Sequence, residues 1–166
     1  MLLSFKAGVN FPTLICTNLK DETVKVPADL SGKRTVIALM LSAKADKLMQ
    51  KWAQPLYNSL VADGIGGMMG GNMYNAKLCF IGAVKGLAKV ALPEMIKKAK
   101  TEVDKKYHSN FMYTDNDLDE LTKSLHITDK SIPHFIVLET DGSILFQTQG
   151  EFTDDKLNDI TGALLN

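Results

Sequence analysis

The chain has 166 residues, of which 45% are apolar and 23% charged. A chain of this length buries roughly two-thirds of the surface that its unfolded form exposes, and this composition is typical of a globular protein, which excludes a disordered or fibrous chain. Lys plus Arg equals Asp plus Glu at 19 each, so no net field attracts nucleic acid or anionic lipid.

The first predicted elements are two short β-strands, Leu14 to Thr17 and Thr23 to Val26, joined by a polar turn. β-favouring runs on either side of such a turn indicate a hairpin. The next element, Thr35 to Leu41, is almost continuously apolar. A run of this kind is typical of a strand covered on both faces, so we expect a central strand.

A helix is predicted to follow that strand. Apolar residues recur at three- and four-residue intervals, and Ser42 stands where a cap for the first turn is needed. Met49 and Trp52 lie on the apolar stripe and should pack in the core. Pro55 falls inside the pattern and should kink the helix, because proline removes one backbone hydrogen bond.

The middle of the chain is less regular. Residues 64–71, GIGGMMGG, lack the third glycine of a GxGxxG phosphate-binding motif, so we expect a loop there and a second strand within residues 72–84. Residues 93–107 predict a helix with Pro93 in its first turn, and residues 117–125 predict a short helix capped by Asp115 or Asp117.

The last part of the chain predicts a β-hairpin and a closing helix. Residues 131–139 and 143–149 are rich in β-favouring residues, and the Asp141-Gly142 pair between them is a hairpin signal. Thr153 then stands at the start of an amphipathic pattern, which predicts a helix to the end of the chain.

Two long segments carry a family resemblance: GVNFPTLICTNLKDETVKVPADLSGKRTVIALML at residues 8–41 and SIPHFIVLETDGSILFQTQGEFTDDKL at residues 131–157. Together with the order of elements, they resemble the thioredoxin-like superfamily in its redoxin or TlpA-like form. The resemblance implies an α/β fold with a central mixed β-sheet flanked by helices, an N-terminal β-hairpin and one domain spanning residues 1–166. It also implies that Pro133 is cis and lies against the turn between the central strand and its helix.

Redox-active relatives carry Cys-x-x-Cys or a single peroxidatic cysteine at that turn. Here residues 41–50 read LSAKADKLMQ and contain no cysteine. Serine and lysine cannot replace a thiol, because the chemistry requires a thiolate and a sulfur that forms and breaks S–S bonds. We therefore expect no oxidoreductase activity of the family's usual kind.

Cys16 and Cys79 are 63 positions apart, so they form no Cys-x-x-Cys motif and favour a reducing compartment. Cys79 lies in a predicted inner strand, where a thiol is an inert small apolar group with a raised pKa. Cys16 is expected nearer the surface in the N-terminal hairpin. The alternative function is therefore an atypical thiol oxidoreductase or peroxiredoxin-like enzyme that uses Cys16.

Residues 96–160 are also similar, more loosely, to the thioredoxin-like domain of mitochondrial ATP synthase assembly factors. That domain likewise lacks Cys-x-x-Cys and acts on a partner protein. This second resemblance favours protein binding, as an assembly module, over catalysis.

An enzymatic alternative would place His134 beside Ser42, Lys44 or Asp46 as a general base for a serine nucleophile. The sequence contains no GxSxG elbow, and no third residue can be assigned to orient the histidine. We expect no catalytic residues at this position.

No cofactor, metal, nucleic acid or membrane span is expected. Met68, Met69 and Met73 are the soft candidate ligands, but loop methionines more often pack or contact partners. The basic residues of positions 97–106 alternate with acidic ones. No run of about 20 apolar residues is present, and the start MLLSFKAGVN lacks a signal-peptide cleavage site, so the expected location is the cytoplasm.

The sequence thus predicts a redox-inactive thioredoxin-like protein that binds another protein or peptide at one corner of the fold, while the partner and the oligomeric state stay open. The corner combines the turn after the central strand, the glycine-methionine loop at residues 64–71 and the entry to the C-terminal hairpin. The predicted binding residues are Ser42, Lys44, Asp46, Lys47, Ile132, Pro133 and His134.

Overall fold

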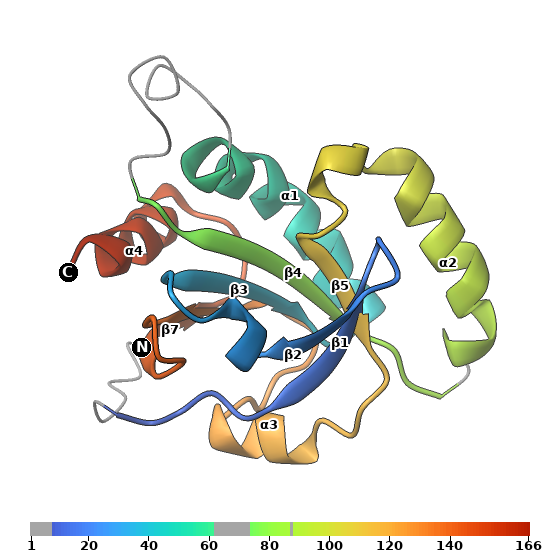
Figure 1. Ribbon diagram of the computed structural model, residues 1–166, viewed down its shortest axis with the longest axis horizontal. Helices are drawn as coiled ribbons and strands as arrows, with labels where there is room; N and C mark the ends of the chain where they lie inside the picture. The colour runs from blue at the N-terminus through green and yellow to red at the C-terminus, as the bar shows by residue number, and fades with distance from the viewer. Residues whose placement is uncertain (1–7, 62–73, 87) are drawn as a thin grey trace.

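A computed structural model describes residues 8–61, 74–86 and 88–166, and this part of the chain contains a seven-stranded sheet with the order β2-β1-β5-β4-β3-β6-β7 (Figure 1). The strands are β1 (Leu14–Asn18), β2 (Thr23–Val26), β3 (Thr35–Met40), β4 (Lys77–Ala83), β5 (Phe111–Thr114), β6 (His134–Leu138) and β7 (Ile144–Gln149). The helices are α1 (Ala43–Leu60), α2 (Ala88–Glu102), α3 (Asp119–Ser124) and α4 (Asp154–Leu165), with 3-10 turns η1 (Ala28–Leu30) and η3 (Lys105–Tyr107).

The sheet is mixed. β3, β4 and β5 run parallel to one another, and the other neighbouring strands pair antiparallel. Parallel neighbours require a crossover, which α1 supplies between β3 and β4 and α2 supplies between β4 and β5. The carboxyl ends of these three strands therefore meet at one edge, the place where open α/β sheets usually bind ligands.

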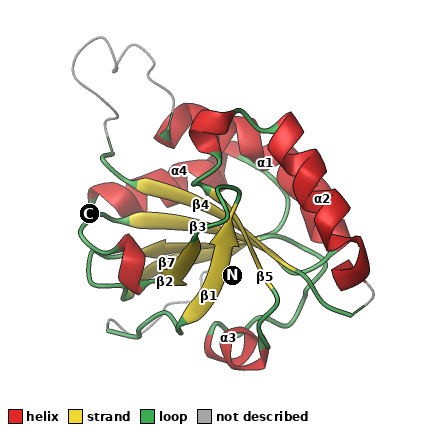
Figure 2. Ribbon diagram, turned by 45° about the vertical axis from the view of Figure 1, so that its right-hand side comes forward, coloured by secondary structure: helices red, strands yellow, loops and turns green. Residues whose placement is uncertain are grey.

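The helices form a layer on each side of the sheet. α1, α2 and α4 lie on one face and α3 lies on the other (Figures 1 and 2). On the α1 face, Trp52 is fully buried, its ring centroid lies 4.1 Å from that of Phe135, and its Nε1 donates to the Gly150 carbonyl at 3.0 Å. The core of the α3 face contains Cys16 and Cys79 among aliphatic side chains.

The N-terminal predictions are confirmed. β1 and β2 form the expected antiparallel hairpin, and β3 lies inside the sheet between β4 and β6 with five of its six residues buried. Ser42 caps α1, and Met49 and Trp52 are in the core, 4% and 0% exposed. Pro55 lies inside α1 as expected.

The predicted start of the helix at Pro93 is wrong. α2 begins at Ala88, so Pro93 lies inside the helix rather than in its first turn. The residues before the proline are good helix formers, and the missing proline N–H costs one hydrogen bond near the beginning of the helix. The helix predicted at residues 117–125 exists as the shorter α3, whose cap position is Leu118; Asp117 instead accepts a hydrogen bond from the Asp119 N–H.

The C-terminal predictions are also confirmed. β6 and β7 form an antiparallel hairpin, and Gly142 at its tip has a φ of +88°, which glycine adopts without strain. The Thr153 hydroxyl accepts from the Lys156 N–H and caps α4.

Candidate binding site

The turn between β3 and α1 is held by one side chain. Ser42 has an extended backbone and its Oγ accepts a hydrogen bond from the Ala45 N–H at 3.2 Å, which satisfies a free donor of the first helical turn. The same hydroxyl donates to the Lys130 carbonyl at 2.8 Å. The turn and the loop before β6, which are far apart in the sequence, are therefore in contact.

The loop before β6 has its own internal support. The Asp129 carboxylate accepts from both the N–H and the hydroxyl of Ser131, at 2.8 Å and 2.6 Å. These hydrogen bonds hold the pKa of Asp129 below its usual value, and the nearby charge of Lys44 lowers it further. Lys44 is exposed, so the rim of this corner carries both a stable anion and a cation.

Ile132 contributes unpaired backbone groups to the corner. The side chain is half-buried, and no hydrogen bond joins the Ile132 N–H or C=O to the part of the chain that the structure describes. The next carbonyl, that of Pro133, accepts from the Gly150 N–H at 2.9 Å. Of the two residues, Ile132 is the one whose backbone is available to a partner.

The structure places His134 away from any partner surface. Its side chain is fully buried, and Nε2 lies 2.7 Å from the Asp129 carbonyl oxygen. A carbonyl only accepts, so Nε2 carries the proton and Nδ1 is an acceptor. Nδ1 is buried and has no hydrogen-bond partner among the described residues. Burial lowers the pKa of His134 and keeps the ring neutral.

This geometry gives no support to the serine–histidine alternative. The Ser42 hydroxyl donates to the Lys130 carbonyl, and within residues 8–61, 74–86 and 88–166 no hydrogen bond links Ser42 to His134. A nucleophile and its base must be in hydrogen-bond reach of each other, or become so in the bound state. Lys44, Asp46 and Lys47 are exposed on the first turns of α1.

The expected cis bond before Pro133 is a further correction. In the described part of the chain the cis X-Pro bond is Val26–Pro27. Trans is the ordinary state of an X-Pro bond, and the family resemblance alone motivated the expectation at Pro133.

Both thiols are inaccessible. Cys16 is 1% exposed and Cys79 is 3% exposed, and burial raises the pKa of each thiol to about 12. Both are free cysteines. The raised pKa expected for Cys79 is confirmed, whereas the expectation that Cys16 lies nearer the surface is wrong: β1 is an inner strand between β2 and β5, and its Cys16 side chain points into the core.

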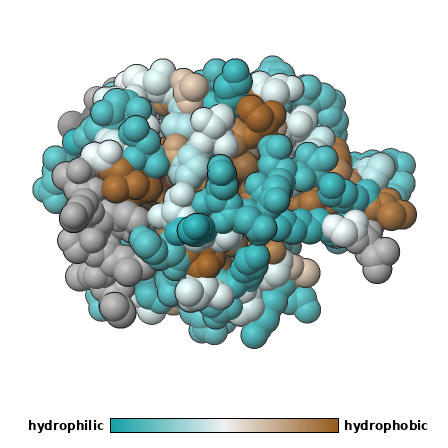
Figure 3. Space-filling view, turned by 90° about the horizontal axis from the view of Figure 1, so that it is seen from below, coloured by the Kyte–Doolittle hydropathy of each residue, from teal (hydrophilic) through white to brown (hydrophobic). Residues whose placement is uncertain are grey.

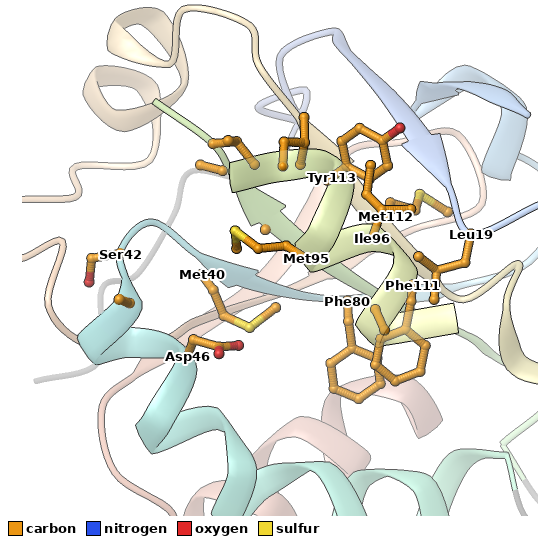
Figure 4. A pocket seen from close by; sticks show the side chains of 16 residues that line it. Leu19, Met40, Ser42, Asp46, Phe80, Met95, Ile96, Phe111, Met112 and Tyr113 are labelled. Carbon is orange, nitrogen blue, oxygen red and sulfur yellow. The ribbon is translucent and has the colours of Figure 1, made fainter. Parts of the chain in front are cut away.

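A cavity that the sequence did not predict lies beside the Ser42 turn. It has a volume of about 300 Å³ and lies between α2 and the carboxyl ends of the parallel strands (Figure 4). Ser42 and Asp46 are at its edge, and most of its lining is apolar. The available signal was the presence of methionine and aromatic residues in β3, β4 and β5, namely Met40, Phe80, Phe111, Met112 and Tyr113. The glycine-methionine loop, with Met68, Met69 and Met73, lies outside the described residues.

Comparison with solved structures identifies the architecture. The thioredoxin domain of a thiol-disulfide oxidoreductase from Bacteroides vulgatus has a TM-score of 0.61 and 16% identity, over 98% of this chain and 100% of that chain. The fold is thioredoxin-like. StoA from Bacillus subtilis has a TM-score of 0.56 and 19% identity, over 91% and 97% of the two chains. The pneumococcal exposed lipoprotein thioredoxin of Streptococcus pneumoniae has a TM-score of 0.57 and 10% identity, over 91% and 98%.

These thioredoxin-like neighbours include thiol-disulfide oxidoreductases, but identities of 10–19% establish the fold alone. No family model and no curated protein matches the sequence. Among the described residues, no helix is long and apolar enough to cross a bilayer, and no three His, Cys, Asp or Glu side chains are grouped to hold a metal ion.

Proposed function

We infer that this chain is a single-domain, redox-inactive thioredoxin-like protein that binds an extended segment of another protein at the corner formed by Ser42 to Lys47 and Ile132. The observation that carries this proposal is the strand-to-helix turn itself. Where thiol chemistry would need a cysteine, the turn has Ser42, and both thiols of the chain are buried elsewhere in the core.

The chemistry of the thiols supports inactivity. Disulfide exchange begins with attack by a thiolate, and the attacking thiol works best with a pKa near the ambient pH. A pKa of about 12 leaves Cys16 and Cys79 almost entirely protonated at neutral pH. Either sulfur would have to leave the core before it met a substrate.

The backbone of Ile132 supports binding. An unpaired N–H and C=O at a partly exposed position can pair with an extended peptide, which is how strand addition supplies affinity without side-chain specificity. Lys44, whose charge acts on Asp129 in the loop before β6, would favour an acidic residue in the bound segment. On the face in Figure 3, the apolar patches formed by the described residues are separated by hydrophilic side chains.

The looser resemblance to assembly factors of this fold makes an assembly role the form of binding that we propose. The proposal also includes a reducing compartment such as the cytoplasm, with which two unpaired thiols are compatible. The second candidate is an oxidoreductase that uses Cys16. It is favoured by the activity named for the solved neighbours, and it requires β1 to open.

An array of extended 12-residue peptides, probed with labelled protein, tests the binding proposal. We expect wild type to bind a subset of peptides enriched in Asp and Glu, and Ile132→Glu to lose that subset. Leu145→Glu is the matched control. Leu145 is likewise an apolar residue and is 41% exposed, but it lies on β7, four residues before Gln149, which pairs with His134 of β6. Equal binding by both variants, or no selective binding by wild type, would reject the corner as a binding site.

A further inference from the structure

Helix α2 covers the sheet without burying any described side chain. From Lys89 to Glu102 every side chain is exposed or half-buried, although Leu92, Ile96 and Ala99 recur at helical spacing on one side. By contrast, the shorter α4 buries three side chains and α1 buries five. An apolar stripe normally packs directly on the sheet beneath it, so α2 stands away from the surface that it covers.

The position of α2 is fixed near its carboxyl end. Lys100 forms an ion pair with Asp21 in the β1–β2 turn, with Nζ 2.7 Å from Oδ2. In the 3-10 turn after α2, Tyr107 makes an edge-to-face contact with Tyr57 of α1, with ring centroids 4.6 Å apart. The space beneath α2 is therefore bounded by the β1–β2 turn on one side and by α1 on the other.

That space is the cavity of about 300 Å³ next to the Ser42 turn (Figure 4). Methionines from three different elements line it, together with aromatic rings from β4 and β5: Met40, Met95, Met112, Phe80, Phe111 and Tyr113. Methionine side chains adapt their shape to what they contact, and polarizable sulfur and aromatic faces suit an apolar ligand. A volume of this size is at the lower end of the range for small-molecule sites.

One charged group faces the cavity. Asp46, in the first turn of α1, is the only charged residue among those that line it, and Figure 4 shows its carboxylate turned toward the side of Met40. Neither a hydrogen bond nor an ion pair joins this carboxylate to residues 8–61, 74–86 or 88–166. The Ser42 hydroxyl is already engaged by Lys130, so Asp46 is the polar group available to orient a ligand.

We propose that this cavity binds a small molecule with an apolar body and one protonated amine, with the amine on the Asp46 carboxylate and the apolar body beneath α2. At roughly 30 Å³ for each non-hydrogen atom, the volume that a water molecule occupies in the liquid, the cavity holds about ten such atoms. The carboxylate attracts an ammonium group and repels a carboxylate, so the site should distinguish amines from acids of the same length.

This inference does not rest on peptide binding at Ile132, since the cavity takes a different class of ligand, although Ser42 and Asp46 belong to both sites. Octylamine, octanol and octanoate are matched probes of about the right size. Titration at low ionic strength, followed by calorimetry and amide chemical shifts, measures binding of each probe to wild type.

We expect octylamine to bind saturably with a Kd below about 1 mM, and octanoate to bind at least tenfold more weakly. Asp46→Asn keeps the shape and should weaken octylamine about tenfold while leaving octanol unchanged. Asp154→Asn is the control, because Asp154 is an exposed acidic residue in the first turn of α4. Ala99→Phe fills the cavity and should abolish binding of all three probes.

The proposal is overturned if octylamine binds wild type no better than 1 mM, or if Asp46→Asn and Asp154→Asn bind octylamine equally well. It is also overturned if the largest amide shifts fall outside α2, the first turn of α1, the carboxyl end of β3 and strands β4 and β5. Amide spectra recorded without ligand establish that each variant is folded.

Discussion

Alkylation of the native protein measures how far burial suppresses its thiols. Iodoacetamide reacts with thiolates, and a free cysteine with a pKa of about 8.5 is roughly 9% ionised at pH 7.5. A thiol with a pKa of about 12 has a thiolate fraction near 3 × 10⁻⁵ at that pH, which is roughly 3,000-fold less.

The lower thiolate fraction is partly offset because a more basic thiolate is a stronger nucleophile. With a Brønsted coefficient of about 0.45, a thiolate that is 3.5 units more basic reacts about 40-fold faster, so ionisation alone slows labelling about 80-fold. Burial adds a second barrier, since Cys16 and Cys79 are 1% and 3% exposed. We expect both thiols of the native protein to react at least about 100-fold more slowly than free cysteine.

Mass spectrometry after timed alkylation measures both rates, and the single variants Cys16→Ser and Cys79→Ser assign them. In urea, both cysteines should react at the rate of a free thiol, which serves as the control. A native Cys16 that reacts within tenfold of free cysteine would show that burial does not protect this thiol, and would reopen the redox alternative.

Three further predictions concern stability. Ser42→Ala removes a helix cap and the hydrogen bond to the loop before β6, so urea denaturation should show a free energy of unfolding lower by about 2 kcal/mol. Thr153→Ala removes a cap alone and should lower it by about 1 kcal/mol. Equal losses would argue against a contribution from the hydrogen bond to the loop. Burial lowers the pKa of His134, so as the pH drops this histidine is protonated in the unfolded chain before it is protonated in the folded one. The free energy of unfolding should therefore fall below about pH 6.5. In denaturation series between pH 7.5 and 5.5, His134→Gln should lack the pH dependence that this histidine contributes. The side-chain hydrogen bond from Arg34 lowers the pKa of Glu139 in the folded protein. The stabilisation from this pair is present above the pKa of the unfolded chain, about 4.3, and is lost as the pH falls through the lower pKa of the folded protein. Glu139→Gln should therefore lower the free energy of unfolding at pH 7 and have less effect at pH 3.

The elements that the sequence predicted well have local causes. β3 is a continuous apolar run, the β6–β7 hairpin is marked by Asp141-Gly142, and α1 and α4 begin at hydroxyl caps. The start of α2 was missed because the preference of proline for the first helical turn is weaker than the tendency of the preceding residues to be helical.

The features that the sequence could not supply depend on contacts between distant segments. Cys16 is buried because its side chain lies in the core of the α3 face together with Leu118 and Leu121, which come about a hundred residues later in the chain. His134 follows Pro133 in the sequence, yet it is the pleat of β6 that turns its ring toward the α3 side of the sheet. The cavity beneath α2 depends on how far that helix stands from the sheet, and the helical pattern alone gives no such distance.

If this thioredoxin-like scaffold performs no thiol chemistry, it should not turn over a disulfide reporter. Wild type and the Cys16→Ser and Cys79→Ser variants are incubated with a fluorogenic glutathione disulfide or with insulin and dithiothreitol. We expect all three proteins to give the same rate as buffer with reductant alone. A wild-type rate clearly above that background, and abolished by Cys16→Ser, would contradict it.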